Sequence, residues 1–329
     1  MSVIGIDLGG TKVAGALFEP DGTVLHKVNR LLEKRSGRQV GALVLEVIDT
    51  LIANQQTGWS NISAIGVCVP GIANSKTQRV WAPNIPEWDD YPLTEEIAHH
   101  IRQPHCNVSV ESDRTCYILG EVWKGAARGC NNALFIAVGT GIGVGILIDG
   151  TVLHGKSDIV GAAGWMALQP PYRQDYDACG CFETYASGAG IARQAQRMIS
   201  LLPASSEEGG EKQKYNSIFY TKEVSEITAQ DVFAAYQQHD EVAVKVLDKA
   251  VEMWGMASAN LISLLNPEKI IWGGGVFGPG VQFLNRIYDE ATRWAQPVSM
   301  RQVEFVPSAL GGDAGLYGAA YLANKSVQD

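Results

Sequence analysis

The sequence predicts an α/β protein built from two similar halves. Short apolar, β-branched runs that end at paired glycines, such as residues 3–10, are typical of buried strands followed by tight turns. Other segments carry apolar residues at the spacing of one helix face. The pattern that opens the chain returns near its middle, which indicates a duplicated architecture. At 329 residues the chain is long for one core and comfortable for two domains.

Three strands are expected at the start of the chain. The segment VIGIDLGG is apolar up to its two glycines, and TKVAGALFEPDGTVLHKV continues with Pro-Asp-Gly as a turn. Residues 3–28 therefore predict strand, glycine turn, strand, turn, strand. Helical spacing of apolar residues predicts a helix over 36–55, and ISAIGVCVPG (62–71) predicts a buried strand that ends at Pro-Gly.

The middle of the chain repeats this opening. The segment LFIAVGTGIGVGILIDGTVLHGK (134–156) has the layout of residues 3–27, and DGTVLH occurs at both 21–26 and 149–154. We therefore expect two similar halves that each open with a glycine-turned hairpin and face each other across a cleft. The remaining expected elements are a helix over 240–265, a strand over 269–275, and helices over 281–295 and 312–326.

Composition argues against several classes of protein. A net charge of −9 disfavours nucleic acid as a partner, because phosphate contacts need a basic face. The chain lacks a run of about 18 apolar residues and its opening residues lack a signal-peptide pattern. Six cysteines spread over the chain fit a reducing compartment. We expect a cytoplasmic protein with neither a membrane nor a nucleic-acid partner.

Three glycine-rich turns are candidates for binding phosphate. They are DLGGT (7–11), GTGIG (139–143) and GGGVFGPG (273–280). Glycines at strand ends let backbone N–H groups approach phosphate oxygens without a Cβ in the way. Each turn alone is weak evidence for phosphate binding, because most glycine-rich turns have only a structural role. The chain has no G-x-x-x-x-G-K-[ST] loop, and its first two turns lie between strands, which disfavours a dinucleotide fold.

Taken together, the three turns resemble those of the actin-like ATPase superfamily, and more narrowly those of the ROK family of sugar kinases and sugar-responsive repressors. The resemblance covers nearly the whole chain. It rests on IGIDLGGTKVAGAL, GVCVPGIANSKTQRVWAPNIPEWDDYPL, ESDRTCYILGE, FIAVGTGIGVGILIDG, CFETYASG and ANLISLLNPEKIIWGGGV. It implies two actin-like (RNase H-like) domains flanking a nucleotide and sugar cleft, and a homodimer. The smaller domain would comprise 1–115 plus 313–329, and the larger 116–312.

The resemblance also implies an activity, the ATP-dependent phosphorylation of a hydroxyl on a hexose or related sugar, as in glucokinases and N-acetylhexosamine kinases. Asp7 would hold Mg²⁺ through water; its alternative role is a strand-end cap. The residues expected to bind the nucleotide are Asp7, Gly9, Gly10, Thr11, Lys12, Gly139, Thr140, Gly141, Gly274 and Gly275.

Asp113 matches the catalytic aspartate of the family. A carboxylate near the γ-phosphate would take the proton of the sugar hydroxyl. The alternative is a helix N-cap, for which Ser112 and Asp113 both qualify. Glu111 is a competing carboxylate, but strand alternation would point it to the opposite side.

Substrate contacts are expected from Gly71, Asn84, Ser112, Trp165 and Glu183. Pro70 and Pro83 belong to the same two motifs. Amide and carboxylate side chains such as Asn84 and Glu183 suit the binding of vicinal hydroxyls. Trp81 and Trp88 would either stack on a sugar ring or belong to the core.

The chain departs from the family where the family binds a structural zinc ion. There a His and three Cys of a C-x-C-G-x-x-G-C-x-E segment are the ligands. Here Trp165 stands at the His position, and Gln174 and Tyr176 stand at two Cys positions, so that Cys181 alone remains in register. Since such a site needs four ligands, we expect no structural zinc.

Other roles for this loop stay open. Cys179 lies near Cys181, so a zinc site that recruits His154 or Asp177 is one alternative, and a C-x-C redox pair is another. We expect packing to hold the loop instead, through Trp165, Pro170, Pro171, Tyr172 and Tyr176.

The sugar pocket departs from the family as well. Ser112, Ala162 and Trp165 stand where the family has Asn, Glu and His. Because polar groups in such a pocket read the substrate's hydroxyls, we expect a shifted substrate preference.

Three further functions compete with sugar phosphorylation. The first is a sugar-sensing regulator; family repressors carry a winged helix-turn-helix before the first phosphate motif, for which we expect no room before the strand that begins at Val3. The second is a sugar- or nucleotide-binding protein without turnover, against which Asp7 and Asp113 argue, because a binding module needs neither. The third is an ATPase without a small acceptor, against which the PNIPEW stretch and Glu183 argue.

Overall fold

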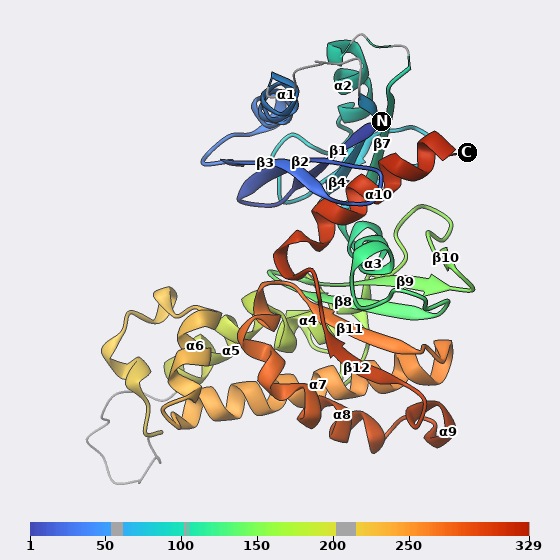
Figure 1. The fold of residues 1–329 in the computed structure, drawn as a ribbon. Coiled ribbons are helices and arrows are strands. Elements are labelled where there is room, and N and C mark those ends of the chain that lie inside the picture. The colour runs from blue at the N-terminus through green and yellow to red at the C-terminus, as the bar shows by residue number, and fades with distance from the viewer. Residues whose placement is uncertain (54–61, 102, 104, 202–214, 329) are drawn as a thin grey trace, which may run out of the picture. The chain divides into compact units, whose positions relative to one another are not determined.

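The computed structural model describes residues 1–53, 62–101, 103, 105–201 and 215–328 (Figure 1). Backbone proximity groups the chain into two compact units. The first unit comprises Met1–Phe135, Gly145–Gly161 and Ser308–Asp329, and the second comprises Ile136–Val144 and Ala162–Pro307. Residues 116–135, 145–161 and 308–312 thus group with the first unit, whereas the resemblance assigned them to the larger domain. The boundaries given from the sequence stay a prediction.

The first unit contains a five-stranded mixed sheet of order β3-β2-β1-β4-β7. The antiparallel strands β1, β2 and β3 pair in sequence, and β4 and β7 then follow β1 in parallel. The strand bounds are β1 (Ser2–Leu8), β2 (Lys12–Phe18), β3 (Val24–Leu31), β4 (Ile62–Val69) and β7 (Asn107–Ser112). A two-stranded sheet of β5 (Ile72–Ala73) and β6 (Val80–Trp81) follows β4.

Helices cover both faces of this sheet. Successive residues of a strand point to opposite faces, so that Ile4 packs in one apolar cluster and Val3 in another. The cluster of Ile4 includes Val47 of α1 (Gly37–Ala53), and that of Val3 includes Leu316 of α10 (Ala314–Gln328). Both helices are labelled in Figure 1. The unit also contains α2 (Leu93–Ile101) and α3 (Asp113–Lys124), and α3 packs along α10.

The helices α3 and α10 approach each other closely at Gly318. A Cβ at this position would lie 1.8 Å from the backbone oxygen of Cys116. We expect Gly318→Ala to lower the free energy of unfolding, measured by urea denaturation, by about 2–3 kcal/mol, because the helices must move apart. Gly312→Ala is the matched control, since a Cβ there meets nothing within 4 Å. Equal losses in the two variants would contradict this packing.

A second five-stranded sheet has the order β10-β9-β8-β11-β12. Its strands are β8 (Ala133–Val138), β9 (Ile142–Ile148), β10 (Thr151–Val152), β11 (Lys269–Gly273) and β12 (Glu304–Pro307). The division between the units passes within β8 and β9. Both sheets share one strand order: three strands that are consecutive in the chain lie side by side, and two strands from later in the chain extend the sheet beyond the first of them. This repeat confirms the duplicated architecture predicted from the sequence.

The second unit is rich in helices, of which α7 is the longest. The side chain of Asp240 accepts hydrogen bonds from the N–H groups of Val242 and Ala243 and so starts α7, and Asn266 ends it in a left-handed conformation. The helices of this unit are α4 (Cys181–Ala186), α5 (Gly188–Ser200), α6 (Ala229–Tyr236), α7 (Glu241–Leu265), α8 (Leu284–Thr292) and α9 (Pro297–Met300).

Most predicted elements are present with shifted ends. The helix expected over 36–55 spans Gly37–Ala53, and positions 54–55 lie outside the described residues. The helix expected over 281–295 is a 3₁₀ turn, Pro279–Phe283, followed by α8. The sequence analysis missed β12, a short strand without fully buried residues.

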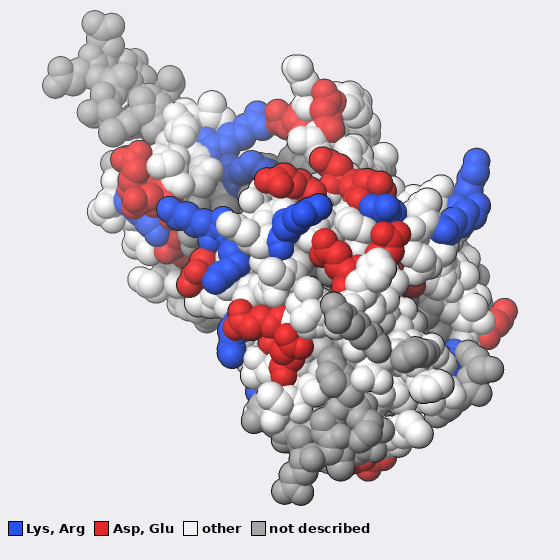
Figure 2. Space-filling model, turned by 90° about the horizontal axis from the view of Figure 1, so that it is seen from above, with Lys and Arg blue, Asp and Glu red and all other residues white. Residues whose placement is uncertain are grey.

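The described helices include none with the length and apolar character that a membrane crossing requires. On the face drawn in Figure 2, lysine and arginine side chains are interspersed with aspartate and glutamate among the described residues. The described part of that face therefore carries no large patch of a single charge sign.

Candidate active site

Asp7 lies where three parallel strands of the first unit end together. It is in register with Cys68 on β4, which is itself in register with Glu111 on β7. Burial raises the pKa of Asp7 to about 6, although the Cys68 thiol and the charge of Lys12 act to lower it. A Cβ at Gly315, in the first turn of α10, would lie 2.9 Å from the Asp7 carboxylate. Asp7 is therefore a desolvated carboxylate that a nearby cation would stabilise.

Asp113 begins α3 directly after β7. Its Oδ1 accepts a hydrogen bond of 2.8 Å from the backbone N–H of Arg114, and the side chain is half-buried. Burial raises the pKa of Asp113 to about 6; the Arg114 charge acts in the opposite direction, and Asp7 adds a smaller upward contribution. Ser112 occupies the N-cap position without a side-chain cap hydrogen bond. Asp113 is thus ionised at neutral pH, with a basicity suited to accepting a proton.

The raised pKa of Asp113 predicts a pH-dependent stability. The pKa of Asp113 is about 6 in the folded protein and 3.8 in the unfolded chain. The contribution of protonated Asp113 to the free energy of unfolding is therefore full below pH 3.8 and is lost as the pH rises through 6. Asp113→Asn removes the cost of the buried charge. We expect it to raise the free energy of unfolding by about 1–3 kcal/mol at pH 7.5, after discounting for partial exposure, and by less near pH 4.

Thermal and urea unfolding at several pH values test this expectation. Asp289→Asn replaces an exposed carboxylate and is the control. A gain for Asp113→Asn that does not change between pH 4 and 7.5 would contradict the burial of the charge.

The first glycine turn leaves its backbone open. It joins β1 to β2, where the N–H of Gly9 donates to the carbonyl of Lys12 at 2.9 Å and the Thr11 carbonyl accepts from Leu32 at 2.8 Å. A Cβ at Gly10 meets nothing within 4 Å, and the side chains of Thr11 and Lys12 are exposed. This turn therefore presents polar groups and one cation to solvent.

The second glycine turn joins β8 to β9 and contacts Glu183. The N–H of Gly139 donates to the Gly141 carbonyl at 2.9 Å, and a Cβ at Gly139 meets nothing within 4 Å. Glu183 Oε2 accepts from the N–H of Ile142 at 2.7 Å. A Cβ at Gly141 would lie 2.7 Å from the same oxygen, so a larger residue here would displace the carboxylate from this position. The side chain of Thr140 is exposed.

The third glycine turn packs against β8. Gly274 has φ +85°, and a Cβ there would lie 2.5 Å from the carbonyl oxygen of Val138. Glycine is therefore required on both grounds. A Cβ at Gly275 meets nothing within 4 Å, which leaves this side of the turn open. Within the second unit, the second and third turns thus both flank β8.

Glu183 and Trp165 lie close together in the second unit. Burial raises the pKa of Glu183, and the hydrogen bond from Ile142 acts to lower it. A Cβ at Gly164, the residue before Trp165, would lie 2.7 Å from Glu183 Oε2. The Trp165 side chain is 58% exposed. The Glu183 carboxylate thus lies against the backbone that leads into Trp165, whose ring is exposed.

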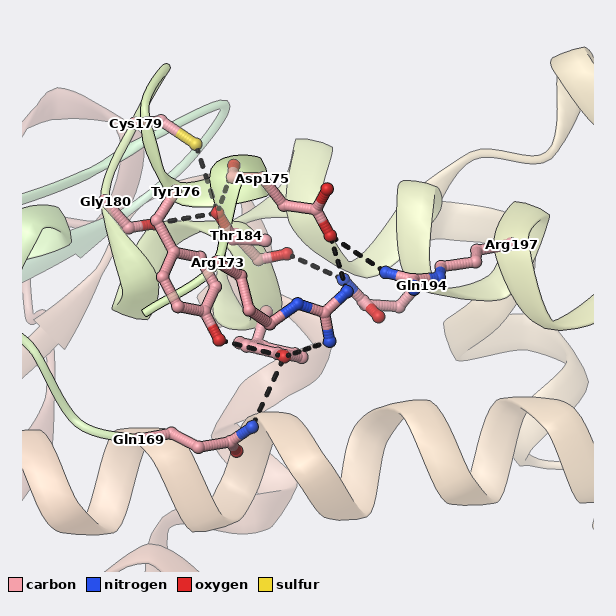
Figure 3. Close-up of polar contacts among 10 residues, drawn as sticks. Gln169, Arg173, Asp175, Tyr176, Cys179, Gly180, Thr184, Gln194 and Arg197 are labelled. Carbon is pink, nitrogen blue, oxygen red and sulfur yellow. Dashed lines mark hydrogen bonds and ion pairs between the residues drawn. The ribbon is translucent and has the colours of Figure 1, made fainter. Parts of the chain in front are cut away.

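Polar contacts hold the loop that precedes Glu183 (Figure 3). Asp175 Oδ2 lies 2.6 Å from Arg173 Nη2 and 2.9 Å from Arg197 Nη1 of α5. The hydroxyls of Tyr176 and Tyr185 lie 3.2 Å apart, and both rings are buried. The loop is therefore fastened to α4 and α5.

The packing expected for this loop is confirmed in part. Tyr176 is buried, and the ring of Tyr172, although exposed, packs edge to face on it. Trp165, Pro170 and Pro171 are exposed. Ion pairs among the charged residues of the loop and with α5 hold it as well.

The two cysteines of the loop have different surroundings. Cys179 Sγ lies 3.5 Å from Thr184 Oγ1 and 3.6 Å from an Arg193 nitrogen, whereas Cys181 is buried. His154, the possible zinc partner, lies in the first unit with its Nε2 2.9 Å from Glu111 Oε2. The described residues contain no cluster of three or more candidate metal ligands. The expectation about zinc stays a prediction.

The remaining predicted substrate residues differ in their exposure. Asn84 and Pro83 are exposed, and Trp81 is 43% exposed. Trp88 is core: it is buried, stacks on Tyr91 and donates to the Gly37 carbonyl. Gly71 needs its glycine, since a Cβ would lie 2.2 Å from the Trp81 carbonyl oxygen.

Ser112 is buried, and its Oγ lies 3.4 Å from Thr115 Oγ1. The side chain therefore faces the protein rather than solvent. The sequence analysis did not single out Arg114, whose Nη2 donates to the Gly71 carbonyl at 3.2 Å. Its position beside Asp113 was the available signal.

Comparison with known proteins identifies the family. The ROK family model matches residues 3–326. A glucokinase of Halalkalibacterium halodurans is 33% identical over 329 residues, covering 98% of this chain and 94% of that protein. The crystal structure of a ROK family glucokinase from Streptomyces griseus in complex with glucose and AMPPNP is 27% identical in sequence and has a TM-score of 0.77. The match covers 99% of this chain and 100% of that chain. A xylose repressor of Bacillus spizizenii is 26% identical over 99% of this chain and 78% of its own length. The chain described here belongs to the ROK family.

Proposed function

We propose that this protein transfers the γ-phosphoryl group of ATP to a hydroxyl of a hexose or related sugar, with Asp113 as the general base. The observation that carries the proposal is the half-buried Asp113 carboxylate, whose pKa is raised to about 6 at the start of α3. The match to relatives named glucokinase along nearly the whole chain supports the reaction class.

The glycine turns fit the nucleotide. Gly10, Gly139 and Gly275 each leave open the space that a Cβ would fill, which lets backbone N–H groups meet phosphate oxygens or the adenosine. Asp7 fits a magnesium ligand acting through water, because it is a desolvated carboxylate. Bound Mg²⁺ would neutralise charge on the phosphates. The residues proposed to hold Mg-ATP are Asp7, Gly9, Gly10, Thr11, Lys12, Gly139, Thr140, Gly141, Gly274 and Gly275.

The chemistry then requires positioning and one proton transfer. Asp113 accepts the proton of the sugar hydroxyl while the hydroxyl oxygen forms a bond to the γ-phosphorus. The bond from that phosphorus to the β,γ-bridging oxygen breaks, and ADP leaves. Lys12 and the first turn stabilise the charge on the transferring group. Exclusion of water prevents hydrolysis of ATP in place of transfer.

The acceptor pocket would use Glu183 and the exposed surface of Trp165, with Gly71 and Asn84 as further contacts. Glu183 accepts hydrogen bonds from hydroxyls. Ser112 is too buried to contact the sugar in the conformation described, and we propose that it acts on Asp113 through the backbone. An aromatic ring at Trp165 favours a sugar with an apolar face or substituent there.

The test is ADP release from Mg-ATP against a panel of hexoses, N-acetylhexosamines and polyols. We expect turnover with one acceptor or a few related ones. Absence of ADP release across the panel, with ATP and a sugar both bound, would favour a regulator without turnover; one relative is named a xylose repressor.

We further propose a homodimer in the cytoplasm without a structural zinc. The family resemblance supports the dimer, and the six cysteines spread thinly over the chain support a reducing compartment. Sedimentation equilibrium and metal analysis of the purified protein test the assembly and the zinc content.

A further inference from the structure

The residues on either side of Asp113 bind a loop from a distant part of the chain. Glu111 Oε2 lies 2.9 Å from His154 Nε2, and Arg114 Nη1 donates to the carbonyl of Ile159 at 3.4 Å. Both partners belong to residues 153–161, which follow β10 and end where the chain leaves the first unit. All these residues lie within the first unit.

Further contacts fix the same loop and the same backbone. The second oxygen of Glu111, Oε1, accepts from the N–H of Ser112 at 2.7 Å. Asp158 Oδ2 accepts from the N–H and the hydroxyl of Ser75, at 3.0 and 3.1 Å. The Glu111 side chain is only 15% exposed, so its contact with His154 is less screened than a surface pair.

Asp113 itself makes a local contact only. Among the described residues, the hydrogen bond recorded for its carboxylate comes from the adjacent Arg114 N–H. A contact to the next residue cannot fix the carboxylate relative to the rest of the site. Glu111 and Arg114, by contrast, are anchored through their side chains to the 153–161 loop, and Arg114 also donates to the carbonyl of Gly71.

We propose that Glu111, His154 and Arg114 are positioning residues that fix the backbone at Ser112 and Asp113 and so aim the Asp113 carboxylate at the acceptor hydroxyl. The inference rests on the proposed function for its kinetic consequence. A base must lie within hydrogen-bond reach of its proton, and a displacement of about 1 Å can cost about 10²-fold in rate. The ground-state contacts to ATP and sugar do not depend on that aim.

The kinetic test compares three variants. We expect His154→Ala to lower kcat about tenfold or more, with both KM values within about threefold of wild type. His154→Gln should recover most of the loss, because its amide N–H can donate to Glu111 Oε2. His100→Ala is the matched control: His100 Nε2 lies 2.8 Å from Asp49 Oδ1 in the same unit, and its side chain is 34% exposed against 41% for His154. It should stay within twofold.

A second measurement does not need activity. Backbone hydrogen exchange over residues 107–118 should be several-fold faster in His154→Ala than in wild type and unchanged in His100→Ala. An unchanged kcat in His154→Ala, an equal loss in the control, or unchanged exchange would each overturn the inference. If wild type phosphorylates no sugar, the proposed function fails, and the exchange comparison alone decides whether the His154 contact orders the segment around Asp113.

Discussion

Asp113→Asn is expected to lower kcat by about 10²- to 10⁴-fold, the range over which a general base contributes. Asparagine has nearly the same shape, and its Oδ1 can still accept from the Arg114 N–H, as the carboxylate does at 2.8 Å. It cannot accept the hydroxyl proton. Since the residues proposed to hold Mg-ATP do not include Asp113, ATP affinity measured by calorimetry should change by less than about threefold.

The control variant for this experiment is Asp289→Asn, an exposed carboxylate, which should keep full activity. The stability gain expected for Asp113→Asn distinguishes a loss of catalysis from misfolding, because the inactive variant should be more stable than wild type at pH 7.5. A rate within tenfold of wild type would place the base elsewhere.

Glu121→Ala is expected to lower the free energy of unfolding by about 3–5 kcal/mol, which would leave little folded protein at 37 °C. Glu121 is fully buried at the end of α3. Its carboxylate accepts from the Ser308 hydroxyl and from the N–H groups of Ala126 at 2.6 Å and Leu310 at 3.2 Å. Alanine removes the buried acceptor that these part-buried groups share, and each hydrogen bond lost at a buried charged group costs about 1–3 kcal/mol.

Glu121→Gln separates the loss of the carboxylate acceptor from the loss of side-chain volume. Its amide keeps one acceptor oxygen but turns a donor toward groups that also donate, so we expect a loss smaller than that of alanine. Glu95→Ala, at an exposed position of α2, should change stability by less than about 1 kcal/mol. Urea denaturation followed by circular dichroism measures all three. Equal effects of Glu121→Ala and Glu95→Ala would contradict the buried network.

The fold was predictable where its signals are local. Alternation and paired glycines placed the hairpin of β1 and β2, and the recurrence of that pattern predicted the similar hairpin of β8 and β9 in the second sheet. The expected actin-like α/β fold is confirmed by the family and its solved relatives. The helix α7 was predictable with its cap, since apolar spacing and Asp240 both lie in the sequence.

The rest depends on contacts between distant residues. His154 pairs with Glu111 across 43 positions and Ser308 with Glu121 across 187, and neither partner carries a local pattern. The burial of Ser112 and the exposure of Trp165 and Tyr172 follow from tertiary packing, which their residue types do not indicate. Sequence reasoning therefore named Asp113 but not the residues that hold its neighbours.

Transfer of the γ-phosphoryl group of ATP to a sugar hydroxyl, with Asp113 as the base, is tested most directly by measuring ADP and sugar phosphate together. A coupled assay and mass spectrometry give both quantities in wild type and in Asp113→Asn. We expect equal amounts of both products with wild type, and the loss of both in the variant. ADP formed without sugar phosphate, or equal sugar phosphate from both proteins, would contradict this role of Asp113.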